Sequence, residues 1–90
     1  MIISQEKAPK ETTAMKYLIA EDFAGQAVPF IFPDRVSHTD MREQLPYTRF
    51  LSAGYVIMEN GSFICNGGDT DLNLFALPED TAILEACFSK

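Results

Sequence analysis

The only histidine of the chain, His38, stands two residues before Asp40, and two cysteines, Cys65 and Cys87, follow later. A thiol beside a histidine that a carboxylate orients is the arrangement of a nucleophilic hydrolase. The same spacing also fits a simpler interpretation, in which His38 is a polar residue in the first turn of a surface helix. A nucleophilic thiol needs an electropositive setting, whereas Cys65 is expected within a strand and Cys87 on an apolar helical stripe. We therefore predict no catalytic residue, with a small Cys/His hydrolase as the alternative.

A second set of polar residues has the spacing of a metal site. Asp69, Asp71 and Asn73 stand where a calcium-binding loop has its first three ligands. Such a loop needs a glycine at its sixth position and a glutamate at its twelfth, where this chain has Leu74 and Asp80. The pattern favours a solvated turn, so we predict no metal and no cofactor, and a metal-dependent enzyme remains an alternative. The glycines of the chain also lack the order of a phosphate-binding loop.

The charge of the chain bears on the class of partner. Thirteen acidic and seven basic residues give a net charge of −6. Because the four charges within residues 1–14 cancel, all of it belongs to residues 15–90. This charge repels nucleic-acid phosphates, and it suits either a basic partner surface or simple solubility. No apolar run approaches the ~18 residues of a membrane span, and no signal-peptide pattern is present. We therefore expect a soluble cytoplasmic protein that binds neither nucleic acid nor a membrane.

The elements that must position these residues begin after a predicted flexible tail at residues 1–14, and they form one domain at residues 15–90. Apolar runs at residues 16–20 and 27–32 predict an antiparallel hairpin with a loop of about six residues. Pro29 has no N–H for a ladder, so its strand is expected at a sheet edge. Residues 49–58 and 63–67 form a second hairpin through Asn60-Gly61, since both residues tolerate the positive φ of a type I′ turn. Gly54 indicates a bulge or a close backbone contact.

Two helices complete the prediction. Ser37 can cap a helix that ends before Pro46, and Asp40 stands where a capping box has its acidic residue. Pro78 opens a final helix with acidic residues in its first turn. Its apolar positions form one stripe that should face the sheet: Ile83, Leu84, Cys87 and Phe88. The sequence thus predicts an α+β fold, in which a small antiparallel sheet of about four strands packs with a short helix and a C-terminal helix.

Several of these segments occur together in a recognisable order. Val36–Met41 holds a His-x-Asp helix start, and Phe50–Val56 holds a Ser-Ala-Gly-aromatic strand. Cys65-Asn66-Gly67 and Asp71–Leu74 follow, with Asn73 at a position where the pattern usually has glycine. Over roughly residues 16–88, the chain resembles small proteins encoded by tailed bacteriophages and prophages.

The resemblance implies a setting for the protein rather than a mechanism. Such proteins look like accessory factors that act on host proteins or in virion assembly. We therefore expect a non-enzymatic phage or prophage accessory protein that binds a host protein, or itself, in the bacterial cytoplasm. The recurring residues form either a candidate functional surface or, equally, a helix cap packed against a bulged strand: His38, Asp40, Ser52 and Gly54. The alternative is a minor virion component in which the edge strand Ala27–Phe32 pairs with a neighbour.

Overall fold

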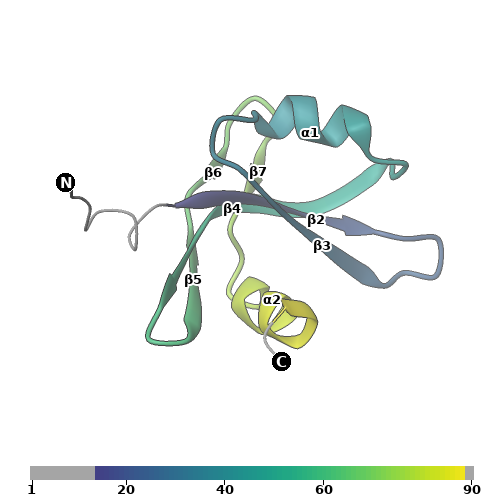
Figure 1. Cartoon of the computed structure of the whole chain (residues 1–90). Helices are drawn as coiled ribbons and strands as arrows, with labels where there is room; N and C mark the ends of the chain where they lie inside the picture. The colour runs from purple at the N-terminus through teal and green to yellow at the C-terminus, as the bar shows by residue number, and fades with distance from the viewer. Residues whose placement is uncertain (1–13, 89–90) are drawn as a thin grey trace.

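The computed structural model describes residues 14–88 and shows the predicted α+β fold (Figure 1). The predicted tail lies outside the described residues, apart from Ala14. In chain order the elements are β2 (Met15–Glu21), β3 (Ala27–Phe32), α1 (His38–Gln44), β4 (Arg49–Glu59), β5 (Ser62–Asn66), β6 (Gly68–Asp69), β7 (Leu74–Phe75) and α2 (Asp80–Phe88).

Both predicted hairpins are confirmed, and they join into one antiparallel sheet with the strand order β3-β2-β4-β5. Asn60 and Gly61 form the turn between β4 and β5, with φ of 54° and 81°, as a type I′ turn requires. Gly54 makes the close contact that was one of its two predicted roles. A Cβ added there would lie 2.6 Å from the carbonyl oxygen of Asn66 and 3.1 Å from a ring carbon of Tyr17.

The irregularity of β4 lies a few residues before Gly54. The pairing register with β2 shifts between Ile19, which faces Ser52, and Ala20, which faces Phe50, so that Leu51 is an extra residue. Side chains of a strand alternate between faces, and one extra residue reverses the alternation. For this reason Phe50 and Ala53 pack in the same apolar cluster.

The sheet lies between α1 on one side and α2 on the other (Figure 1), and an apolar cluster packs on each of its faces. On one face, α2 covers a cluster that centres on Tyr17, Ile19, Val56, Phe63 and Leu84. On the other face, α1 and the turn between β6 and β7 cover a cluster that centres on Leu18, Phe32 and Ala53. The side chain of a sheet residue therefore points either toward α2 or toward α1, because successive side chains of a strand point to opposite faces.

The short helix α1 forms as its sequence predicts. The Ser37 hydroxyl accepts a hydrogen bond from the backbone N–H of Asp40 at 3.0 Å, and the helix ends at Gln44, before Pro46. Helix α2 only partly follows its predicted apolar stripe. Its buried side chains are Asp80 and Leu84, one turn apart, whereas Cys87 and Phe88 in the last turn are exposed. The prediction was wrong for these two residues, because the buried positions of α2 lie in its first two turns and its last turn is exposed.

Each of the two edge strands of the sheet has an interruption in its outward row of backbone hydrogen-bonding groups. Pro29 lies in β3, at the edge where its missing N–H predicted it. At the opposite edge, the backbone N–H of Phe63 in β5 donates to the Glu85 carboxylate of α2 at 3.4 Å. Each edge thus carries one position that another strand would find blocked.

Candidate functional site

His38 is buried, contrary to its predicted place on a helix surface. As the first residue of α1 it is only 1% exposed, and its ring lies edge-on to the rings of Phe32 and Tyr55. The Nε2 atom lies 3.0 Å from the carbonyl oxygen of Gly54, and Nδ1 lies 3.1 Å from Oδ2 of Asp69. The N-cap at Ser37 turns this first residue toward the sheet, where the β6–β7 segment covers it. His38 therefore joins α1, β4 and β6.

Asp69 is engaged on both of its carboxylate oxygens. While Oδ2 faces His38, Oδ1 accepts the backbone N–H of Leu72 at 3.1 Å and so shapes the turn between β6 and β7. Asp71 and Asn73, the other two residues of the calcium-like pattern, are exposed. Within residues 14–88 no three metal-ligating side chains gather in one place. The chemistry of this loop is thus that of a hydrogen-bonded turn tied to α1.

A second buried polar cluster lies on the opposite face of the sheet. Asp80, also 1% exposed, accepts three hydrogen bonds: from the Tyr17 hydroxyl at 2.5 Å, the Ser52 hydroxyl at 3.0 Å and the Leu77 backbone N–H at 2.9 Å. The last of these bonds joins the Asp80 carboxylate to a backbone N–H three residues earlier, just before α2 begins. Asp80 thereby starts α2 and fastens it to β2 and β4.

Both weak acids near Asp80 hold their protons more tightly than usual. Burial, aided by the hydrogen bond to Asp80, raises the pKa of the Tyr17 hydroxyl far above its ordinary value. Burial also raises the pKa of the Cys65 thiol. A nucleophilic cysteine requires the opposite shift. Cys65 packs on the α2 face and His38 on the α1 face, so the geometry does not bring the thiol and the imidazole together.

The four residues of the candidate functional surface do not form one surface. His38 and Gly54 are in contact, and both are buried. Ser52 is buried on the opposite face, against Asp80. Asp40 is exposed in the first turn of α1. Three of the four therefore serve the interior of the fold, and only Asp40 is accessible to a partner.

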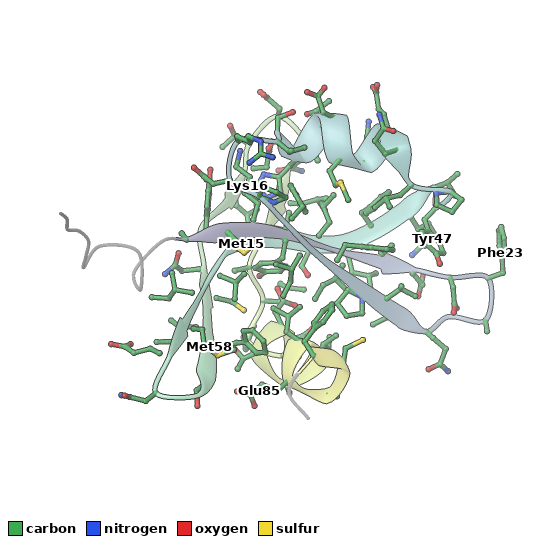
Figure 2. The ribbon with its side chains drawn as sticks, viewed as in Figure 1. Met15, Lys16, Phe23, Tyr47, Met58 and Glu85 are labelled. Carbon is green, nitrogen blue, oxygen red and sulfur yellow. The ribbon has the colours of Figure 1, made fainter. Side chains whose placement is uncertain are left out.

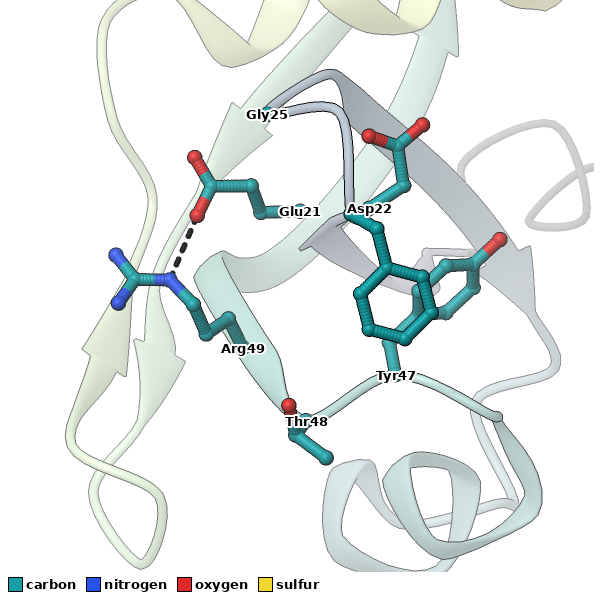
Figure 3. A pocket seen from close by; sticks show the side chains of 7 residues that line it. Glu21, Asp22, Gly25, Tyr47, Thr48 and Arg49 are labelled. Atoms are coloured by element: carbon teal, nitrogen blue, oxygen red, sulfur yellow. Dashed lines mark hydrogen bonds and ion pairs between the residues drawn. The ribbon is translucent and has the colours of Figure 1, made fainter.

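An open cavity of about 320 Å³ lies elsewhere, between the β2–β3 turn and the segment that leads into β4 (Figure 3). Its lining includes Phe23 in the turn and Tyr47 before β4. Phe23 is fully exposed, and Figure 2 shows it at the tip of the β2–β3 hairpin. Tyr47 is half-buried and packs on the ring of Phe30 at 5.9 Å between centroids. Sequence reasoning missed both residues, although a lone phenylalanine in the polar stretch Glu21–Gln26 was a signal.

The polar lining of this cavity is ordered by short bonds. The Arg49 guanidinium donates from Nε to Oε1 of Glu21 at 2.6 Å, across the paired strands β2 and β4 (Figure 3). Oδ1 of Asp22 accepts the backbone N–H groups of Ala24 and Gln26 at 2.9 and 2.8 Å. These bonds fix the turn that carries the exposed Phe23.

A second hollow, of about 280 Å³, lies between β3 and α2. Its lining is mostly apolar and includes Pro29, Ile83 and the exposed Cys87. Among residues 14–88, its lining has none of the charged groups that distinguish the cavity at the β2–β3 turn.

Comparison with protein-family models, with curated proteins and with solved structures finds no match to this chain. No helix among residues 14–88 has the length and apolar character needed to cross a membrane.

Proposed function

We propose that this protein is a binding module that engages a protein partner through the β2–β3 turn and the adjoining cavity, without catalysis of its own. The observation that carries the proposal is the exposure of Phe23, whose whole ring meets solvent beside a concave surface. Aromatic side chains are enriched at the energetic centres of protein interfaces, because they bury a large area and lose little conformational entropy. Phe23 is the side chain of this surface best suited to be such an anchor.

The polar residues of the fold support the same proposal. His38 and Asp69 on one face, and Ser52 and Asp80 on the other, use their hydrogen-bonding groups on one another or on the backbone. Their contacts account for their burial without a substrate. In contrast, no packing contact within residues 14–88 accounts for the position of Phe23.

The biological setting that we propose is that of a phage or prophage accessory protein, and it rests on the resemblance of residues 16–88 described above. A host protein is the proposed partner. The alternative role of a virion component whose edge strand pairs with a neighbour is less favoured, since Pro29 removes one donor from that edge.

A matched pair of variants tests the proposal. Immobilised wild-type protein, Phe23→Ala and Met58→Ala are exposed to a bacterial host lysate, and any protein retained by the wild type is purified and its affinity measured by calorimetry. Met58 is also an exposed apolar side chain, and it lies at the opposite end of the molecule (Figure 2). We expect Phe23→Ala to weaken binding about tenfold or more, and Met58→Ala to leave it nearly unchanged. A purified partner that binds Phe23→Ala as tightly as wild type would overturn the proposal, as would a strictly monomeric protein that retains nothing.

A further inference from the structure

We propose that the cavity at the β2–β3 turn receives an arginine side chain of the partner protein, an inference that rests on the function proposed above. The cavity combines two aromatic rings with carboxylates, and these are the two groups that a guanidinium contacts best. A guanidinium is planar and weakly hydrated, so it stacks on aromatic faces while it donates to a carboxylate. The cavity volume of about 320 Å³ accommodates one such side chain.

The charges of the lining favour a cation. The cavity carries two carboxylates, Glu21 and Asp22, against one guanidinium, Arg49. Among residues 14–88, the ion pair between Glu21 and Arg49 leaves the charge of Asp22 uncompensated. Within residues 14–88, Oδ1 of Asp22 is held by the turn and Oδ2 has no protein donor. The net charge of −6 on the whole chain also attracts a basic partner, as the charge of Asp22 does.

The two rings differ in how they are held. Tyr47 is fixed by its contact with Phe30, with ring planes tilted by 48°, and it offers a preformed platform. Phe23 is unconstrained by packing, and it can close over a bound side chain from the tip of the turn. Figure 3 shows the ring of Tyr47 and the Glu21–Arg49 pair on either side of the turn that carries Asp22 and Gly25.

The test uses the full chain labelled with ¹⁵N and a matched pair of probes, N-acetyl-arginine amide and N-acetyl-citrulline amide. The two probes have nearly the same shape, but only arginine is charged. At constant ionic strength, we expect arginine to shift the backbone amide resonances of Gly25, Thr48 and Arg49 in a saturable manner, and citrulline to shift them little. Equal shifts with the two probes, or no shift with arginine up to tens of millimolar, would overturn the proposal.

Three variants assign the effect to its groups. Asp22→Asn keeps the oxygen that holds the turn and removes the charge, so we expect the arginine affinity to fall about two- to fivefold. Asp34→Asn makes the same charge change at an exposed site outside the cavity, and we expect no more than a small effect. Phe23→Leu keeps an apolar side chain without the ring face, so a loss of about two- to fivefold is expected if the ring stacks on the cation. An equal response of the two carboxylate variants would count against a cation site at this cavity.

The failure of this inference can be told apart from the failure of the proposed function. If a purified partner depends on Phe23 but not on Asp22, and its binding is insensitive to salt, the turn is a protein-binding surface and the arginine site is wrong. If the arginine probe binds as expected but the partner binds Phe23→Ala as tightly as the wild type, the cation site is supported and the proposed function is wrong.

Discussion

Replacing Asp80 by alanine removes the acceptor on which three donors of the interior depend. Two of them are the hydroxyl groups of Tyr17 and Ser52, which are fully buried, so solvent cannot replace the lost acceptor. The third, the N–H of Leu77, is only partly buried. The change should therefore release α2 from the sheet at the point where the helix starts.

The magnitude follows from the two buried donors. A buried donor without its acceptor costs about 1–3 kcal/mol, more when the lost acceptor was charged, so the free energy of unfolding should fall by roughly 4 kcal/mol. A domain of this length has only about 5–13 kcal/mol in total, so the loss is a large share of its stability. With about 4–8 °C per kcal/mol, the melting temperature should fall by roughly 15–30 °C.

Urea unfolding and thermal melting, followed by circular dichroism, measure these changes. Asp80→Asn keeps one acceptor oxygen and should cost less than alanine, and Ser52→Ala should cost about 1 kcal/mol. Glu79→Ala is the control, since it removes an exposed carboxylate from the neighbouring residue and should change the free energy of unfolding by less than about 0.5 kcal/mol. If Asp80→Ala were no more destabilising than Glu79→Ala, the role given to the buried carboxylate would be refuted.

Three further predictions concern titration, thiol reactivity and close packing. Because the pKa of Tyr17 is raised in the folded protein, the unfolded chain releases this proton at a lower pH than the folded chain does. The contribution of Tyr17 to the free energy of unfolding should therefore be complete below about pH 10 and should decrease as the pH rises above that value. Urea titrations from pH 8 to 11 should show a smaller fall for Tyr17→Phe, and an identical fall would contradict the shift. The exposed Cys87 should react with a thiol reagent at least about tenfold faster than Cys65, which is half-buried and has a raised pKa; loss of the fast phase in Cys87→Ser, measured by absorbance, checks the assignment. Gly54→Ala should lower the free energy of unfolding by about 1–3 kcal/mol, because its methyl group would press on a backbone carbonyl oxygen; Gly25→Ala, where the space is open and only the positive φ is strained, should cost less, and the reverse order would refute the packing argument.

Features set by neighbouring residues were predictable from the sequence. The Asn60-Gly61 turn and the Ser37 cap depend on the local preferences of the residues that form them, and both are confirmed. The placement of Pro29 at an edge follows from one missing donor.

The buried polar contacts were not predictable, because they join residues that are distant in the chain. Tyr17 and Asp80 are 63 residues apart, and only the packing of α2 across the sheet brings them together. The burial of His38 likewise depends on Asp69, which lies in β6, after the second hairpin in the chain. In the candidate site, Phe23 was visible in the sequence as an apolar residue in a polar turn, but the cavity beside it exists only after β2 and β4 pair.

The blocked edges of the sheet have a consequence for the protein at high concentration. In an antiparallel ladder, a residue without an N–H must stand at a position that points away from its neighbour strand, so Pro29 interrupts the free side of β3. On β5, Glu85 already holds the N–H of Phe63 and places a carboxylate in the path of an incoming strand. Each border of the sheet, as residues 14–88 form it, therefore has one position that opposes the continuous addition of further copies, which is the first step toward fibrils. The exposed Phe23 is thus available for the recognition proposed above, while these two positions oppose polymerisation of the sheet.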